Sequence, residues 1–335
     1  MRYLNIAERE VIVDMILKKA EELHDLSPHM RASITTREIM VDVTIALLPA
    51  FLGSIYFFGL KSIALVLTAV FVSVATEYIW QKLRKEQITA FDFSAVVTGI
   101  LLAFNMPITA PIWLVIVASV FSILVIKQFF GGIGNNFANP ALMGRALIML
   151  LWPASIGQNV TTYHNSADVV SSATVLGLLK AGQEIREFST WDMFIGNIPG
   201  AIGETSKLLL LIGFAYLCYR KIVNISTAVA YIITVVAITF IFGPEGLFTG
   251  DILGNLLGGG LILGACFMIT DYPSVAPRVK VTIAIVAGIF TAIIRIWGLY
   301  PEGVCFGILA ANCLSGFIDH FIKPHIYGVN LKRNR

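Results

Sequence analysis

The chain has 335 residues, of which 57% are hydrophobic and 13% are charged, with a formal net charge of +3. A soluble domain carries about 25% charged residues, so this composition excludes a water-soluble globule. The apolar blocks are long enough for helices that cross a hydrocarbon core, which takes about 20 residues. Blocks such as Ile63–Ala75 and Ile112–Ile126 do not alternate as the strands of a membrane β-barrel do. The sequence therefore predicts an all-α integral membrane protein.

Residues 1–38 are rich in charge and are expected to form a cytoplasmic N-terminal segment without a cleaved signal peptide. Between residues 6 and 23, apolar side chains recur among charged ones, which is typical of an amphipathic helix lying on a membrane surface. An amphipathic helix that faces water fits the same pattern equally well.

About ten transmembrane helices are expected after this segment, in two groups of five. Prolines and glycines interrupt several of them, as in the broken helices of transporters. The first repeat covers 39–153, an extracytoplasmic segment covers 154–205, the second repeat covers 206–322, and a basic cytoplasmic tail covers 323–335. The expected spans are 40–58, 62–80, 93–106, 110–127, 138–153, 206–219, 223–242, 252–270, 279–297 and 303–321.

A weak internal repeat supports this division. Pro107 and Pro111 follow one apolar span as Pro273 and Pro277 follow another, and a glycine comes at the same distance after each pair. Because an odd number of spans separates the equivalent helices, the two halves are expected to be inverted relative to each other. Inverted repeats place binding sites near the membrane midplane, between the halves.

The distribution of lysine and arginine predicts the sidedness, because positively charged loops are retained in the cytoplasm. With the N-terminus inside, most of these residues, Lys127 among them, fall on the cytoplasmic side. Both termini are therefore expected in the cytoplasm, and the segment 154–205 outside. The residues that fall outside are Lys61, Lys180, Arg186, Lys207 and Arg295.

The extracytoplasmic segment contains the run Asp168-Val-Val-Ser-Ser-Ala-Thr-Val-Leu176. Its small residues suit a turn that starts a helix, with Ser171 or Ser172 as N-cap. No histidine or lysine lies close enough in sequence to activate Thr174 as a nucleophile. The run instead offers an accessible hydroxyl to a modifying enzyme.

Residues 171–174 resemble the flavinylation motif Ser-(Gly/Ser/Ala)-Ala-Thr of the NqrB/RnfD family, the membrane subunits of the sodium-pumping quinone reductase and of the Rnf complex. Further family landmarks occur in the same order along nearly the whole chain. They are 27–29 (SPH), 92–99 (DFSAVVTG), 131–140 (GGIGNNFANP), 200–206 (GAIGETS), 270–273 (TDYP), and 300–303 (YPEG) with Asn312.

The resemblance implies that a flavin transferase joins FMN through its phosphate to the hydroxyl of Thr174. It also implies a second, non-covalent flavin, riboflavin, held by Asn136 and Asn139 of the glycine-rich run and faced by Asp271. Taken alone, the same run could be a tight break between spans in which the asparagines cap helix ends. It is not a phosphate loop, because no Lys-Ser/Thr pair follows it.

The implied function is that of a flavin-carrying subunit of an Rnf-type complex, a translocase that couples electron transfer between ferredoxin and NAD to Na⁺ or H⁺ translocation in a bacterial inner membrane. Implied partners are other membrane subunits, a second FMN-carrying subunit, and iron–sulfur and NAD-binding subunits; no nucleic acid partner is expected. An inverted-repeat channel or transporter without a cofactor is the alternative, and a structural anchor for redox partners is a third possibility.

Two further groups of residues have open interpretations. Asp42, Glu77, Arg145 and Asp319 lie in or beside apolar blocks, and each either contacts an ion path or sits at the membrane interface. The four cysteines form no CxxC pair and are expected to be small buried hydrophobes.

Overall fold

The computed structural model describes residues 35–156, 174–182, 188–204, 206–243, 246–270 and 279–321. The residues from Thr36 onward form one compact unit. The expected surface helix at 6–23 and the basic tail at 323–335 lie outside the described residues.

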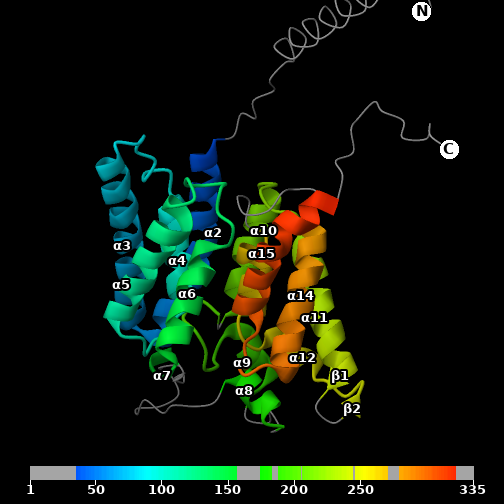
Figure 1. The fold of residues 1–335 in the computed structure, drawn as a ribbon. Helices are drawn as coiled ribbons and strands as arrows, with labels where there is room; N and C mark the ends of the chain where they lie inside the picture. The colour runs from blue at the N-terminus through cyan, green and yellow to red at the C-terminus, as the bar shows by residue number, and fades with distance from the viewer. Residues whose placement is uncertain are drawn as a thin grey trace, which may run out of the picture. The chain divides into compact units, whose positions relative to one another are not determined.

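The described unit consists almost entirely of helices (Figure 1). The first predicted half contains α2 (Thr36–Phe58), α3 (Leu60–Arg84), α4 (Ser94–Phe104), α5 (Ile112–Phe121) with the π-helical turn η1 (Ser122–Gln128), and α6 (Pro140–Leu151). Three short helices follow, α7 (Pro153–Ile156), α8 (Val175–Lys180) and α9 (Thr190–Ile195). The second half contains α10 (Lys207–Tyr219), α11 (Ile225–Ile241), α12 (Ile252–Leu257), α13 (Leu261–Leu263) with the π-helical turn η3 (Gly264–Met268), α14 (Lys280–Trp297) and α15 (Val304–Phe321).

Between α11 and α12 the chain forms an antiparallel pair of short strands, β1 (Phe242–Gly243) and β2 (Gly246–Leu247). This hairpin departs from the all-α expectation. Gly246 has a φ of 136°, which an L side chain rarely adopts.

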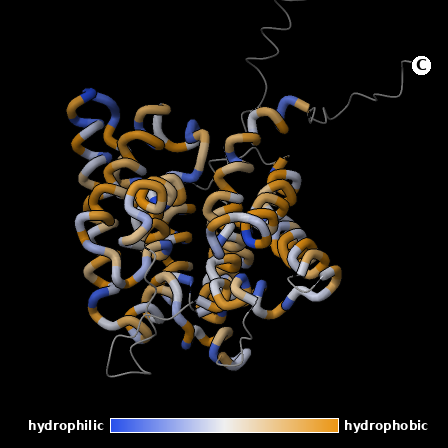
Figure 2. The backbone as a smooth tube through the Cα atoms, turned by 60° about the horizontal axis from the view of Figure 1, so that its bottom comes forward, coloured by the Kyte–Doolittle hydropathy of each residue, from blue (hydrophilic) through white to orange (hydrophobic). Residues whose placement is uncertain are grey.

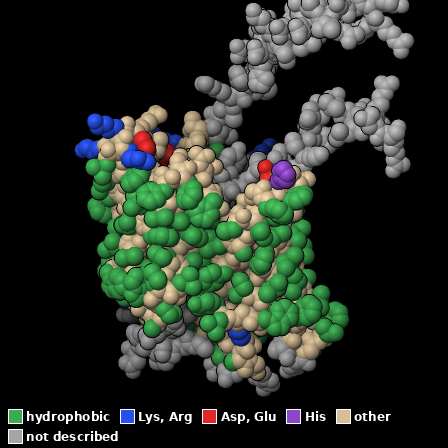
Figure 3. All heavy atoms as spheres, in the orientation of Figure 1, with side chains coloured by type: hydrophobic (Ala, Val, Ile, Leu, Met, Phe, Trp, Pro, Cys, Tyr) green, Lys and Arg blue, Asp and Glu red, His purple; other side chains and the backbone are tan. Residues whose placement is uncertain are grey.

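The prediction of a helical membrane protein is confirmed. Four helices, α2, α3, α14 and α15, are long and apolar enough to cross a membrane, and shorter apolar helices lie between them. Hydrophobic residues predominate along the helices (Figure 2). On the face drawn in Figure 3 they cover most of the surface, and lysine and arginine gather near the end of α3. Such an apolar exterior suits lipid rather than water.

The short α4 shapes the centre of the unit. Its 11 residues extend about 16 Å at 1.5 Å per residue, about half of a hydrocarbon core. The backbone that follows it is irregular and pairs with the segment before α10: the amide of Gly203 donates to the carbonyl of Phe104 at 2.9 Å, and the amide of Ile202 to that of Met106 at 3.0 Å. Protein groups thus satisfy this non-helical backbone, as membrane depth requires.

Helices of the two halves pack in corresponding pairs. Within the halves, α3 packs on α5 and α11 packs on α14. Between the halves, α2 lies against α10 and α6 against α15 (Figure 1). The halves therefore meet along two helix pairs, and each pair joins the elements of the same rank in the two groups.

The cysteine expectation is correct for two residues and wrong for one. Cys266 and Cys305 are buried and Cys218 is partly buried, but Cys313 is exposed. Cys313 lies in the middle of α15, and Leu314 and Phe317 of the same helix are exposed as well. An apolar exterior accepts a thiol as readily as a core does, so burial could not be inferred from the apolar sequence around it.

Candidate functional site

Two cavities lie at opposite ends of α4 and α6. The glycine-loop cavity, of about 730 Å³ with its open mouth, is bordered by residues from the starts of both helices, including Ser94, Asn136 and Asn139. The Thr174 cavity, of about 680 Å³ with its open mouth, is bordered by Asn105 after α4 and by Arg145 and Met149 of α6, together with Thr174 and Glu302.

Thr174 is the N-cap of α8, a position that was expected to fall on Ser171 or Ser172, which lie outside the described residues. Its Oγ1 accepts a hydrogen bond from the amide of Gly177 at 3.1 Å. The residue is only 7% exposed, so the expectation of an accessible hydroxyl is wrong for this conformation.

The burial of Thr174 follows from the way α8 is anchored. Leu176 packs against Gly258 and Gly259 at the break between α12 and α13, where a side chain would leave it no room. At the other end of α8, Lys180 Nζ donates to the carbonyl of Tyr300 at 3.1 Å and to that of Gly298. The hydroxyl is therefore held against the Thr174 cavity.

Arg145 organises a buried set of charges in the wall of this cavity. Its Nη1 donates to Asn105 Oδ1 at 2.8 Å and to Glu204 Oε1 at 2.9 Å, and its Nη2 donates to Glu302 Oε2 at 2.6 Å. These four residues, the Arg145 cluster, come from α6, the end of α4, and the segments before α10 and α15. Among the described residues, Arg145 Nε and Glu204 Oε2 are buried without a hydrogen-bond partner.

The glycine-rich run forms the turn between η1 and α6. Gly131, Gly132 and Gly134 have φ values of 97°, 86° and 91°, so the turn itself requires glycine at these positions. Asn139 caps α6: its Oδ1 accepts from the amides of Ala141 at 3.0 Å and Leu142 at 3.3 Å. The capping interpretation is therefore confirmed for Asn139.

Asn136 differs from Asn139. It lines the glycine-loop cavity, and its Oδ1 is buried without a partner in the part of the chain that is described. Such an orphaned acceptor fits a ligand that carries a hydrogen-bond donor. Thr270 also borders the cavity, whereas Asp271, the next residue, lies outside the described residues.

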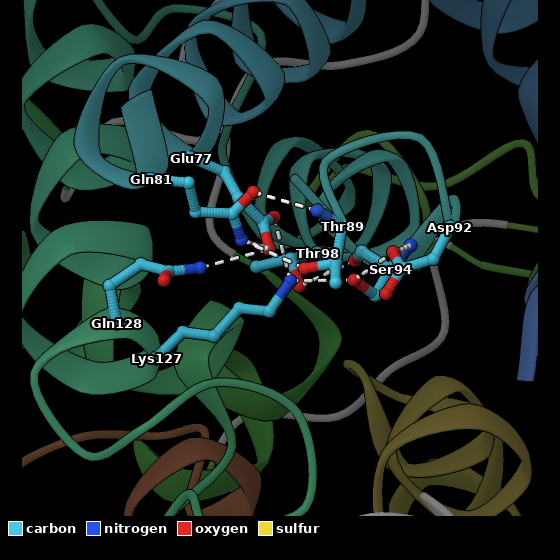
Figure 4. A network of polar contacts seen from close by, with 8 residues as sticks. All are labelled: Glu77, Gln81, Thr89, Asp92, Ser94, Thr98, Lys127 and Gln128. Carbon is cyan, nitrogen blue, oxygen red and sulfur yellow. Dashed lines mark hydrogen bonds and ion pairs between the residues drawn. The ribbon is translucent and has the colours of Figure 1, made fainter. Parts of the chain in front are cut away.

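Next to this cavity lies a network of buried polar groups (Figure 4). Lys127 Nζ contacts Glu77 Oε2 at 2.7 Å and Ser94 Oγ at 2.6 Å, and both charged side chains are 1% exposed. Gln128 and Gln81 donate to Glu77 Oε1 at 2.9 and 3.3 Å. Lys127, which the charge count places on the cytoplasmic side, lies in the core of the unit because η1 carries it there. Glu77 is the buried ion-pair partner of Lys127.

Asp42 makes a different kind of pair. Its carboxylate accepts from Tyr216 Oη at 2.7 Å and from Arg220 Nη2 at 2.9 Å, which ties α2 to the end of α10. The Arg220 side chain is 49% exposed, so this contact lies at the edge of the unit. Within the described ranges, no three His, Cys, Asp or Glu side chains gather closely enough to hold a metal ion.

A family model described as "NQR2, RnfD, RnfE family" matches residues 24–328. The chain belongs to this family. The chain is 46% identical to a subunit of the "Na(+)-translocating ferredoxin:NAD(+) oxidoreductase complex" of Acetobacterium woodii, over 90% of this chain and 94% of that protein. It is 37% identical to a subunit of the "Proton-translocating ferredoxin:NAD(+) oxidoreductase complex" of Clostridium ljungdahlii, over 90% and 95%. With a subunit of the "Ion-translocating oxidoreductase complex" of Escherichia fergusonii it shares 29% identity over 90% and 97%.

Two members of the Arg145 cluster, Glu204 and Glu302, could have been found from the sequence but were missed. Glu204 and Glu302 occur in the family landmarks 200–206 and 300–303, yet no role was inferred for them. Their signal was available, because an ionisable residue beside an apolar span needs a partner. The partner of both glutamates is Arg145, a cation that its apolar neighbours place in a predicted span.

Proposed function

We propose that this chain is the flavin-carrying membrane subunit of an Rnf-type complex, which couples electron transfer between ferredoxin and NAD to Na⁺ or H⁺ translocation. Family membership and the names of the three relatives support the assignment to the complex. The observation that supports the flavin is the position of Thr174 against a cavity that residues of both predicted halves line.

The proposed cofactors are FMN, esterified through its phosphate to Thr174, and riboflavin in the glycine-loop cavity. A bound flavin supplies electron transfer, and the protein supplies position and polarity. Asn136 would hold the second flavin directly, Asp271 would face it, and Asn139 would support the site by fixing the start of α6.

The proposed setting is a bacterial inner membrane, with both termini in the cytoplasm and Thr174 outside. The proposed partners are further membrane subunits, a second FMN-carrying subunit, and subunits that bind iron–sulfur clusters and NAD. We also propose that the two groups of five spans are inverted repeats. The corresponding packing of α3 with α5 and α11 with α14 supports this, as does the pairing of α2 with α10 and α6 with α15.

Replacing Thr174 by alanine is expected to abolish covalent flavin. The chain is co-expressed with a flavin transferase, denatured, and run on a gel under ultraviolet light, where only covalently bound flavin fluoresces with the protein. Thr190→Ala, at the exposed start of α9, is the matched control and is expected to keep the band. A Thr174→Ala chain that still fluoresced would refute the site, and a wild-type chain that never did would favour the channel or transporter.

Replacing Asn136 by alanine is expected to remove most of the non-covalent flavin, because its Oδ1 is a buried acceptor without a partner among the described residues and the side chain borders the glycine-loop cavity. The measurement is riboflavin released per mole of purified protein on acid precipitation. Asn135→Ala is the matched control, since Asn135 is exposed and its amide reaches only Gly131 of the same turn. Equal riboflavin content in both variants would place the second flavin elsewhere.

A further inference from the structure

The Thr174 cavity has the chemical character of a site for a flat, mostly apolar ring. Much of its lining is apolar or aromatic: Pro107, Met149, Pro153, Tyr300 and Pro301. Tyr300 itself stacks on Phe306, with ring centroids 5.4 Å apart, so its position is fixed. Small-molecule sites combine such walls with a few placed polar groups.

Besides Thr174, the polar part of the lining comes from three members of the Arg145 cluster. Arg145, Asn105 and Glu302 border the cavity, and Arg145 keeps its Nε–H without a partner among the described residues. A buried donor left without a partner costs about 1–3 kcal/mol. An occupant with a hydrogen-bond acceptor within reach of Nε would remove that cost.

More positive charge lies behind the wall. Lys207 Nζ donates to the carbonyl of Glu204 at 2.5 Å, and Arg295 donates to the carbonyl of Asn255 at 2.6 Å. Both side chains are buried. Among the described residues, Arg145, Lys207 and Arg295 thus supply three buried cations that interact electrostatically with the two carboxylates of Glu204 and Glu302. These five side chains together carry a formal charge of +1, in surroundings where water screens little.

Resting on the proposed function, we infer that the Arg145 cluster is the receptor for the isoalloxazine ring of the flavin carried on Thr174, with Arg145 as a positioning residue that favours the reduced ring. Uptake of two electrons and one proton converts the neutral ring into an anion. The guanidinium stabilises that anion more than the neutral ring, and Glu302 opposes it. Arg145 thereby raises the reduction potential of the flavin, and Glu302 lowers it.

The test is a redox titration of the intact flavinylated protein, with dithionite as the reductant, mediator dyes, and flavin absorbance as the readout. Arg145→Gln is expected to lower the midpoint potential and Glu302→Gln to raise it. Each shift is at least tenfold in the ratio of reduced to oxidised flavin, about 30 mV for a two-electron couple. Arg145→Gln leaves two buried carboxylates without their cation, so this variant can fail to fold. In that case Arg145→Lys is used instead, and the lysine variant is expected to keep most of the wild-type potential.

Asp42→Asn is the matched control, because it removes a carboxylate from an arginine at the edge of the unit and is expected to leave the potential unchanged. Opposite shifts for Glu302→Gln and Arg145→Gln support the inference, since loosened packing alone does not change sign with the charge removed. If the Arg145 and Glu302 variants kept both the covalent fluorescence and the wild-type potential, the inference would be overturned. That result would also be obtained if Arg145 held only the phosphate of the cofactor. A wild-type chain without covalent fluorescence would instead refute the proposed function.

Discussion

Replacing Lys127 by methionine is expected to destabilise the protein by about 3–5 kcal/mol, because the change leaves the carboxylate of Glu77 buried without its cation. Both side chains are 1% exposed, so water cannot take over the role of the ammonium group. Ser94 loses the same partner. The amides of Gln128 and Gln81 still donate to Glu77, but neutral donors compensate a buried charge only in part.

The measurement is thermal unfolding in detergent, followed by the reaction of a thiol-specific dye with Cys266 and Cys305, which are buried until the protein opens. Arg84→Met is the control, because the Arg84 and Glu86 side chains are 61% and 51% exposed and such a pair contributes about 0–1 kcal/mol. Adding Glu77→Gln to Lys127→Met is expected to recover most of the loss, since it removes the unpaired charge. If Lys127→Met unfolded at the same temperature as Arg84→Met, the buried pair would not hold this region together.

Hydropathy and helix-breaking residues located the longer apolar helices, but not the short helix α9 or the β1–β2 hairpin. The break around Pro107 and Pro111 predicts the short α4, and Asn139-Pro140 places the start of α6, because proline at the first helical position and asparagine before it are strong local signals. Such features depend on neighbours in sequence, so they can be read without knowing the fold.

The contacts that make the site depend instead on residues far apart in sequence. Lys127 lies 50 residues from Glu77, and Arg145 lies 59 from Glu204 and 157 from Glu302. A charge count assigns each of these residues to a membrane side or a span without reference to a partner. For this reason it counted Lys127 with the cytoplasmic charges, without its partner Glu77, and left Glu204 and Glu302 without a role.

The roles of the proposed flavin-site residues also depend on contacts that the local sequence does not reveal. The proline after Asn139 marks that residue as a helix cap, but nothing in the neighbouring sequence shows that the Oδ1 of Asn136 is buried without a partner among the described residues. Thr174 was identified through a family resemblance, whereas its burial depends on the packing of α8 against the distant break between α12 and α13.

The close contact between α2 and α10 predicts a second substitution with a large effect on the free energy of unfolding. At Gly213 of α10, a Cβ would overlap the backbone carbonyl oxygen of Ala46 of α2, and Gly53 of α2 in turn accommodates Leu209 of α10. Small residues allow helix backbones to approach closely within a membrane, where association depends on packing and not on the hydrophobic effect. Because the obstacle is backbone, a new side chain can be accepted only if the two helices move apart.

Gly213→Val is therefore expected to destabilise the protein by about 3 kcal/mol, at the upper end of the usual cost of overpacking. The same change at Gly316 of α15 is the control, since that helical glycine has open space around its Cβ position. Gly316→Val is expected to be neutral or slightly stabilising, because valine has the higher helix propensity. Thiol-dye unfolding of both variants measures the difference. Equal transitions would mean that α2 and α10 can separate at little cost, and that the halves are held together by the contact between α6 and α15 instead.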